Sequence, residues 1–467
     1  MGGLLHLLVT SFLLYFSRAE ATSAVGVNYG QLGNNLPLPP DAVRLIKSRL
    51  SAGSVKLYDA NPQILRALSN TGLEVCTMVP NELIANISAD QALADRWVGS
   101  NIVPFYPVTR IRHVLVGNEI LSDPNNRWFW LKLVSAMRRV QKALKKNQIR
   151  NVKVGTSMAI DTLELSSVYP PSNGSFRSDI SGSVMKPMLQ FLSETKSYLY
   201  FDPYPYFHWA KDPEKINLDY ALLESKSIRY TDPGTGLVYT NLFDQMVDSM
   251  VFAMEKLGYP NIRILMAETG WPSSGDYDQI GANIYNAATY NRNLVKKLKA
   301  RPPVGTPARP GQAMQGFIFA LFNENQKPGP TTERHFGLLY PNGSRVYEID
   351  LSGKAPSSGY ELLPAPTNNK PYKGRIWCVV APGSNNRTAL EAALTHSCSQ
   401  GNGTCEAIRP GKACHEPDSV LSHVSYGFSS YWAQFRKSGA SCFFNGLATQ
   451  TIKDPSHGSC KFPSVTL

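Results

Sequence analysis

The sequence predicts an α/β protein, in which a (β/α)8 TIM barrel is followed by a small disulfide-stapled C-terminal domain. Two observations lead to this fold class. Eight strand-like runs alternate with helical patterns over about the first 350 residues, and six of the seven cysteines lie in the last ninety. A chain of 467 residues with a hydrophobic fraction of 43% exceeds what a single core usually supports, so two domains are expected.

The eight strand-like runs are short, apolar and nearly evenly spaced. They are residues 25–30, 54–60, 74–80, 113–119, 152–158, 198–206, 263–269 and 315–324. Helical patterns with start signals lie between the first of them: 42–50 after Pro39-Pro40-Asp41, 63–69 after Asn61-Pro62, and 89–98 after Ser88. An open doubly wound sheet shows a similar alternation. The barrel is favoured because the spacing is near even and no Gly-rich phosphate loop is present.

Polar and aromatic residues gather where these runs end, and two of them are glutamates. Glu119 stands near the end of the run 115–120 (LVGNEI), and Glu268 directly follows the apolar residues 264–267 (ILMA). A single glutamate after a strand is usually a solvated residue, but Asn118 precedes one and Trp271 follows the other closely. In a parallel barrel all strand ends face one mouth, so the two carboxylates could meet there, with Trp271 as a platform for a sugar ring. Two opposed carboxylates are what glycosidic bond cleavage requires.

The N-terminal sequence predicts a secretory signal peptide over residues 1–21. An apolar run from 4 to 16 precedes the small-residue pattern Ala19-Glu20-Ala21. The run is too short for a membrane span, and no other stretch approaches the ~20 apolar residues that a span needs. The sequence therefore predicts a secreted protein without a transmembrane segment.

Secretion changes how the cysteines are interpreted, because an oxidising compartment favours disulfides. The six clustered cysteines permit fifteen connectivities and are Cys378, Cys398, Cys405, Cys414, Cys442 and Cys460. No metal is expected, since no CxxC pair occurs and the nearby histidines show no ligand spacing. Five sequons suit a glycosylated surface: Asn86, Asn173, Asn342, Asn386 and Asn402.

The net charge of +12 and the pI near 9.2 imply attraction to an acidic partner. For a secreted chain, matrix polysaccharide is the favoured partner, and no nucleic acid is expected. A basic run from Arg138 to Lys146 is typical of a solvated helix face.

Several motifs together resemble plant β-1,3-glucanases of glycoside hydrolase family 17, over residues 25 to about 347. The motifs are 26–37 (GVNYGQLGNNLP), 55–59 (VKLYD), 116–119 (VGNE), 204–207 (YPYF), 268–275 (ETGWPSSG) and 336–340 (FGLLY). The resemblance implies a retaining hydrolase of β-1,3-glucan that uses no cofactor.

Residue by residue, the resemblance implies that Glu119 is the acid/base and Glu268 the nucleophile. It also implies that Asn118 bonds the sugar 2-hydroxyl. Further substrate-binding residues would be Tyr29, Tyr58, Tyr206, Glu324 and Lys327. One departure is Asp202, where the family usually has asparagine. It could add charge beside the site and shift the pKa of Glu119, or simply keep a hydrogen bond.

Beyond the predicted hydrolase domain at 22–350, residues 351–375 are rich in Pro, Ser, Gly and Asn and read as a linker. Residues 376–461 resemble a carbohydrate-binding module of family 43. That family's pattern implies the pairs Cys378–Cys442, Cys398–Cys405 and Cys414–Cys460. The rings of Tyr426, Tyr431 and Trp432 would supply a glucan-binding face or fill the small core, two readings of equal weight.

The resulting hypothesis is a monomeric, secreted endo-β-1,3-glucanase of the cell wall, tethered to callose-type glucan by its module. A glucan-binding wall protein with little turnover is an alternative. A transglucosylase is another, because an acceptor sugar can intercept the same covalent intermediate.

Overall fold

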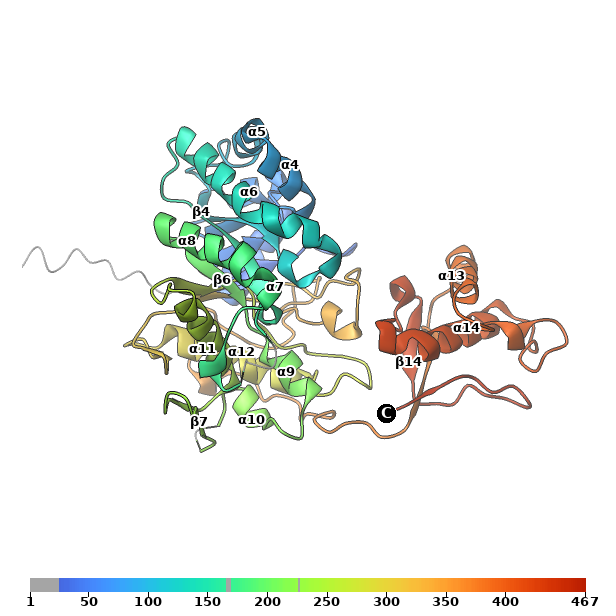
Figure 1. Ribbon diagram of the computed structural model, residues 1–467. Coiled ribbons are helices and arrows are strands. Elements are labelled where there is room, and N and C mark those ends of the chain that lie inside the picture. The colour runs from blue at the N-terminus through green and yellow to red at the C-terminus, as the bar shows by residue number, and fades with distance from the viewer. Residues whose placement is uncertain (1–24, 165–168, 226) are drawn as a thin grey trace, which may run out of the picture.

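The structure is a computed structural model that describes residues 25–164, 169–225 and 227–467. The predicted signal peptide at 1–21 lies outside the described residues. Within them, eight parallel strands close into a barrel in the order β1-β12-β9-β6-β5-β4-β3-β2 (Figure 1). The strands are β1 Val25–Tyr29, β2 Ser54–Leu57, β3 Glu74–Val79, β4 Arg110–Asn118, β5 Lys153–Ala159, β6 Tyr198–Asp202, β9 Arg263–Met266 and β12 Gln315–Ile318. The predicted fold class is confirmed.

The strands match the eight predicted runs, but β2, β6, β9 and β12 end three or more residues earlier than expected, and the difference is largest for β6 and β12. The run predicted over 198–206 stops at Asp202, because Pro203 has no N–H for the ladder and Pro205 opens helix α9 (Pro205–Lys211). The run over 315–324 stops at Ile318. The residues after both stops therefore belong to loops at the C-terminal mouth of the barrel.

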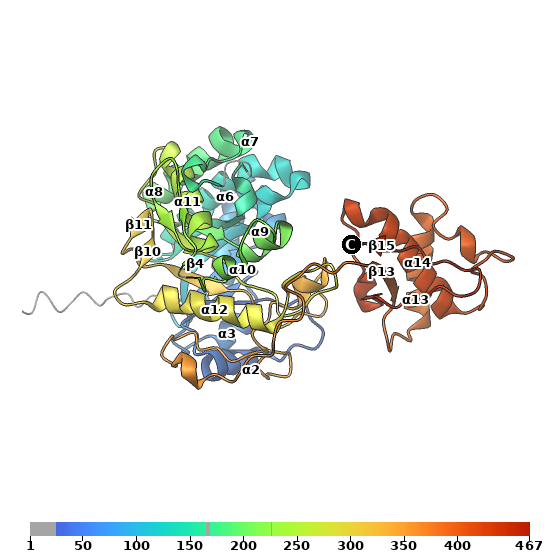
Figure 2. The ribbon, with the colours of Figure 1, turned by 90° about the horizontal axis from the view of Figure 1, so that it is seen from below.

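Helices surround the barrel and pack on its outer face (Figures 1 and 2). They are α2 Pro39–Leu45, α3 Pro62–Ala67, α4 Ile84–Ala89, α5 Gln91–Asn101, α6 Arg127–Lys146, α7 Ser178–Ile180, α8 Lys186–Thr195, α9, α10 Leu218–Ala221, α11 Leu242–Lys256 and α12 Ile284–Lys299. Helix α5 begins at Gln91 and not at 89. Asp90 is its N-cap and accepts from the Ala92 N–H at 2.9 Å, whereas the Ser88 hydroxyl donates backwards to the Ala85 carbonyl at 2.8 Å.

Short antiparallel strand pairs lie in the loops of this domain. They are β7 Tyr230–Thr231 with β8 Val238–Tyr239, and β10 Gly305–Thr306 with β11 Arg309–Pro310.

The barrel has two apolar layers. The larger lies between the strands and the helices, and the smaller fills the barrel interior with residues such as Met78, Leu115, Tyr200 and Phe317. Because this interior is packed, the barrel is not a pore, and ligands must bind at its ends.

The C-terminal domain forms a separate lobe beside the barrel (Figure 2). Its antiparallel sheet has the order β14-β13-β15; helix α14 packs against this sheet, and α13 packs against α14. The elements are β13 Arg375–Val380, α13 Arg387–Ser399, α14 Val420–Phe435, β14 Ala448–Thr451 and β15 Val465–Thr466. Its cysteines form three disulfides, Cys378–Cys442, Cys398–Cys405 and Cys414–Cys460, which are the pairs that the family resemblance implies.

One carboxylate of the barrel joins the two lobes. Asp278, in the loop that leads from β9 to α12, accepts from the Arg436 guanidinium at 2.9 and 3.2 Å and from Gln450 at 3.1 Å. Nearby, the Arg334 guanidinium lies 3.5 Å from the ring centroid of Phe443. Among the described residues, no helix is both long and apolar enough to cross a membrane.

The disulfides should contribute unequally to the stability of the C-terminal domain. Cys378 and Cys442 are 64 residues apart, whereas Cys398 and Cys405 are 7 apart. Loop-closure entropy assigns about 4 kcal/mol to the longer loop and about 2 kcal/mol to the shorter. We expect the paired Ser substitutions at Cys378 and Cys442 to lower the thermal midpoint of this domain more than those at Cys398 and Cys405. Calorimetry of the full chain checks this, and equal shifts would contradict it.

Candidate active site

A cleft of about 730 Å³ opens at the C-terminal mouth of the barrel, where both predicted glutamates lie. Both polar and aromatic side chains line it, as a sugar chain requires. The predicted residues in this lining are Tyr58, Asn118, Glu119, Glu268, Glu324 and Lys327.

Glu119 stands at a sharp turn directly after β4. Its backbone is left-handed, with φ 46° and ψ 30°, which is rare for a residue other than glycine. Gly117, two residues before it, also has a positive φ, of 78°. A Cβ added at this glycine would lie 2.7 Å from the Ile84 side chain and 2.9 Å from that of Asn81. The turn is therefore built around a glycine, and it directs the Glu119 side chain into the cleft.

Glu268 is buried and accepts three hydrogen bonds from side chains. Its Oε1 accepts from Lys56 Nζ and from the Tyr58 hydroxyl, both at 2.7 Å, and its Oε2 accepts from the Tyr204 hydroxyl at 2.8 Å. Lys56 is completely buried, so it forms an ion pair with Glu268 that solvent does not screen. Both oxygens of Glu268 are thus fixed in position by donors.

The two glutamates have opposite electrostatic environments. Burial and the negative charge of Glu268 raise the pKa of Glu119 to about 7. Burial also opposes ionisation of Glu268, but the charge and hydrogen bond of Lys56, together with the Tyr58 hydroxyl, hold its pKa below the ordinary value. One carboxyl is therefore prepared to hold a proton near neutral pH while the other is ionised, the division that acid/base chemistry needs.

Asn118 has a fixed amide orientation. Its Oδ1 accepts from Ser157 Oγ at 2.9 Å and from Lys56 Nζ at 3.2 Å, while Asn81 clamps its backbone N–H and C=O at 2.7 and 3.1 Å. The Nδ2 group is therefore the part of this side chain that is available to a ligand.

Asp202, the departure from the family pattern, is buried at the end of β6. Burial and the charges of Glu268 and Glu119 raise its pKa well above the ordinary value. These influences favour the neutral form of the carboxyl, which would carry no charge, like the asparagine usual at this position.

Three predicted substrate-binding residues, Trp271, Tyr206 and Tyr29, are buried and do not belong to the cleft lining, so their contact with substrate stays a prediction. Trp271 is 0% exposed, donates from Nε1 to the Gly281 carbonyl at 2.8 Å, and packs edge-on against Tyr206 at 5.2 Å. Tyr206, on α9, is buried against this indole, and Tyr29 is buried with its ring centroid 6.2 Å from that of Phe322. These rings support the loops that form the cleft.

Glu324 and Lys327 line the cleft and are joined through the backbone, where the Lys327 N–H donates to the Glu324 carbonyl at 3.1 Å, but their side chains contact other residues. Glu324 Oε1 accepts from the Leu32 N–H at 2.7 Å. Lys327 forms an ion pair with Glu333 at 3.0 Å and lies 4.0 Å from the ring centroid of Phe319.

Among the residues of the cleft region that the sequence-based list missed, three stand out by their contacts or exposure. Lys56 and Tyr204 bind Glu268, and Phe207 is 44% exposed in the cleft lining. A signal for Lys56 existed, since a lysine within the short apolar strand 54–57 must face a partner or water. Tyr204 and Phe207 lie in the YPYF motif, but only the early end of β6 places them at the mouth.

In the C-terminal domain, two of the three candidate rings belong to its core. Tyr426 and Trp432 are buried in its apolar clusters, whereas Tyr431 is half-buried against Phe435, Phe444 and His396. Tyr426 and Trp432 therefore fill the small core of this domain, which is one of the two interpretations given above.

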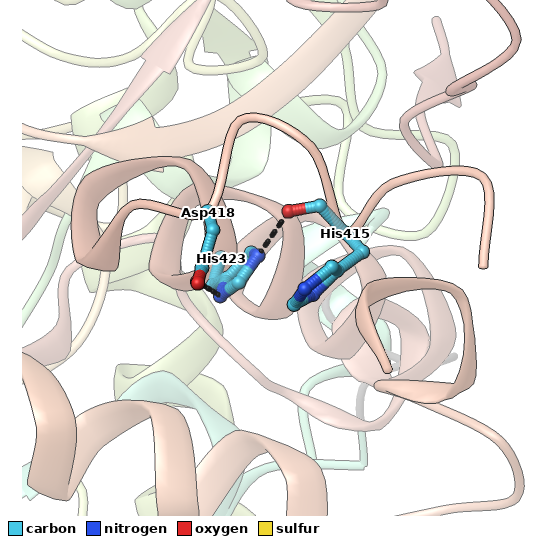
Figure 3. A group of neighbouring side chains, drawn as sticks. All are labelled: His415, Asp418 and His423. Atoms are coloured by element: carbon cyan, nitrogen blue, oxygen red, sulfur yellow. Dashed lines mark hydrogen bonds and ion pairs between the residues drawn. The ribbon is translucent and has the colours of Figure 1, made fainter. Parts of the chain in front are cut away.

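One group of side chains in this domain has the composition of a metal site. His415, Asp418 and His423 offer ligand atoms within 4.8 Å of one another (Figure 3). His423 Nε2 donates to the His415 carbonyl at 2.7 Å, and its Nδ1 lies 4.0 Å from Asp418 Oδ1. These contacts join the loop to the first turn of α14 without an ion. That the chain needs no metal stays a prediction.

A (β/α)8 barrel with two carboxylates of opposite proton affinity at its C-terminal mouth defines a glycoside hydrolase. The comparisons identify which one: residues 25–351 match the glycosyl hydrolases of family 17, and the chain belongs to this family. Residues 376–449 match the X8 domain, which corresponds to carbohydrate-binding module family 43.

Relatives resemble the chain over nearly its whole length. It is 53% identical, over 96% of its own length and 92% of the relative's, to the Arabidopsis thaliana protein named "Probable glucan endo-1,3-beta-glucosidase A6". It is 36% identical, over 98% and 97% of the two chains, to a glucan endo-1,3-beta-D-glucosidase of Olea europaea.

Among solved structures, a beta-1,3-glucanase and allergen of Cryptomeria japonica pollen matches with a TM-score of 0.66. The identity is 42%, and the match covers 70% of this chain and 99% of that one.

The ion pair of Lys56 and Glu268 should dominate the stability of the barrel mouth. Lys56→Met leaves a buried carboxylate unpaired, and we expect it to lower the free energy of unfolding by about 3 to 5 kcal/mol at neutral pH. The ion pair stabilises above the unfolded pKa of a glutamate, about 4.3, and is lost as pH falls through the lower folded value. The deficit of the variant should therefore shrink in acid.

The control for this prediction is the double variant Lys56→Met/Glu268→Gln, in which neither charge remains. Urea titrations at pH 7 and pH 4 should show that it recovers part of the loss. A double variant as unstable as Lys56→Met alone would mean that packing, and not charge, is what the lysine supplies.

Proposed function

We propose that the protein is a secreted, retaining endo-hydrolase of β-1,3-glucosidic bonds in β-1,3-glucan. The observation that carries this proposal is the opposed proton affinity of Glu119 and Glu268 in one cleft. The glucan specificity follows from family membership and from relatives that are named as glucan endo-1,3-beta-glucosidases.

In the proposed mechanism, the protonated Glu119 gives its proton to the glycosidic oxygen while Glu268 attacks the anomeric carbon. The bond to the leaving sugar breaks, and a glycosyl ester on Glu268 forms. Glu119, now a carboxylate, takes a proton from water, which hydrolyses the ester. Lys56, Tyr58 and Tyr204 would hold the attacking carboxylate in place, and Asn118 Nδ2 would bind the sugar 2-hydroxyl. Retention requires the two carboxyl groups to lie about 5 to 5.5 Å apart.

Among the other predicted cleft residues, we propose that Glu324 and Lys327 bind substrate through their polar groups. The exposed ring of Phe207 and the half-buried ring of Tyr58 would provide stacking surface for the sugar faces.

We further propose a domain division into a signal peptide at 1–21, a hydrolase domain at 22–350, a linker at 351–375 and a glucan-binding module at 376–461. Such a chain would act as a monomer in the cell wall. The asparagines of all five sequons are exposed, which suits glycosylation in the secretory route.

Two active-site variants test the proposal. Glu119→Gln and Glu268→Gln should each lower kcat on laminarin by at least about 100-fold, because each removes a group that acts in the transition state. Wild-type enzyme should release short internal fragments, with the β-anomer first by proton NMR. The α-anomer first would exclude retention. Products longer than the starting oligosaccharide would indicate transglucosylation. Binding without turnover would mean that the protein is a glucan-binding protein and not a hydrolase.

The pH profile of kcat/KM tests the assignment of roles. Activity should fall as pH rises through about 7, because Glu119 loses the proton it must donate. It should also fall in acid, below the ordinary range of a carboxyl, because Glu268 must be ionised. The limb near pH 7 should be absent from the residual activity of Glu119→Gln. A limb that persists there would assign it to another group.

The C-terminal module should increase binding to insoluble glucan without taking part in the chemistry. The full chain should sediment with insoluble β-1,3-glucan, and a chain ending at residue 350 should sediment less while it hydrolyses soluble oligosaccharides at a similar kcat. Equal sedimentation of both chains would contradict a binding role for the module.

A further inference from the structure

A second hollow, of about 950 Å³, opens at the opposite end of the barrel from the carboxylate cleft. Its walls include the first residues of five barrel strands, namely Glu74, Arg110, Lys153, Tyr198 and Gln315. The glucan site at the C-terminal mouth therefore does not use it, and the two sites can be occupied independently.

The charge of this hollow is strongly one-sided. Six of its lining residues are cationic: Arg110, Arg112, Lys153, Lys299, Arg301 and Lys354. Within the described residues of the lining, Glu74 is the only acid, and it faces both Arg110 at 3.1 Å and Arg112 at 3.7 Å. Even without Lys299 and Arg301, the four cations Arg110, Arg112, Lys153 and Lys354 outnumber Glu74 and the nearby Asp350, so a positive potential extends from the hollow into solvent.

The titration of neighbouring groups is consistent with this excess of positive charge. Burial, followed by the charges of Arg112, Lys153 and Arg263, lowers the pKa of His113 to about 3. Burial and the adjacent Arg301 likewise lower the pKa of Lys299.

The cationic groups are held in place before any ligand binds. Arg110 donates to the Gly72 carbonyl at 3.0 Å, and Lys153 donates to the Thr195 carbonyl at 3.2 Å. The loop that carries Lys354 is closed by Asp350, whose carboxylate accepts backbone N–H groups of Ser352, Lys354 and Ala355 at 2.8 to 3.0 Å. The charge of Asp350 also acts on Lys299 and offsets part of the positive charge there, while Lys354 is exposed.

We propose that this hollow binds a carboxylated polysaccharide, a polyuronate, alongside the neutral glucan at the other end of the barrel. A polyuronate presents carboxylates at regular intervals, which the fork of each arginine matches. It also presents hydroxyls, for which Asn151 and Gln315 in the lining offer donors and acceptors.

A single-stranded nucleic acid fits the hollow less well. Base stacking needs open aromatic faces, but Tyr198 is the one aromatic ring of the described lining apart from His113, and the Arg263 guanidinium covers it at 4.3 Å from its centroid. The preference for a polysaccharide also rests on the secretion proposed above.

Two charge-reversal pairs test the proposal with the same change in net charge. Arg301→Glu/Lys354→Glu alters exposed groups of the hollow, and Lys142→Glu/Lys145→Glu alters exposed groups of α6 elsewhere on the barrel. Binding of full-length protein to polygalacturonate is measured by calorimetry at low ionic strength. We expect the hollow pair to weaken binding at least tenfold and the α6 pair less than threefold. Hydrolysis of laminarin should be unchanged in both, which shows that the barrel is intact.

Several outcomes would overturn the proposal. Equal weakening by both pairs would mean that overall charge, and not the hollow, attracts the polymer. Displacement of polygalacturonate by laminarin from Glu268→Gln protein would place it in the glucan cleft. Tighter binding of a single-stranded RNA oligonucleotide, with the same response to the hollow pair, would assign the hollow to nucleic acid. Because hydrolysis is measured separately, failure of this proposal and failure of the proposed function are distinguishable.

Discussion

The site depends on one electrostatic constraint, which is that a buried glutamate must remain ionised inside a closed barrel. Glu268 meets it through Lys56 and two tyrosine hydroxyls, all within 2.8 Å. The same lysine also binds Asn118, the neighbour of Glu119. A single buried cation therefore connects the two halves of the site, from β2 across to β4 and β9. The charge that it stabilises on Glu268 in turn raises the proton affinity of Glu119 and of Asp202.

Two buried rings of the ETGWPSSG and YPYF motifs, Trp271 and Tyr206, pack behind this arrangement. Trp271 contacts Tyr206, Trp209 and Tyr290 behind the mouth, and its indole N–H bonds the backbone of the following loop. That loop continues to Asp278, which contacts the C-terminal domain. Glu268 and the contact with the module thus lie on one continuous segment, so the module is held near the face of the barrel where glucan would bind.

The two ends of the barrel differ in chemistry as well as in position. The C-terminal mouth concentrates carboxyl groups and aromatic rings, whereas the N-terminal end concentrates arginine and lysine. Part of the net charge of +12 is concentrated at this N-terminal end, by basic residues that are far apart in the sequence. The basic run on α6 is conspicuous in the sequence, yet two of its members form ion pairs, Arg138 with Glu194 and Lys146 with Asp95.

By itself, the sequence determined the eight strands, both glutamates and the cysteine-rich domain, because these are local signals: short apolar runs with abrupt polar ends, and composition. Only the tertiary structure decided which side chains reach the cleft. Trp271 follows Glu268 by three residues but packs against residues of the helical layer, while Lys56 lies within a strand and reaches Glu268 across the barrel. The direction of a side chain depends on where each strand stops and how the next loop turns. Those features arise from proline positions, from Gly117 and from barrel closure, which join residues far apart in the chain.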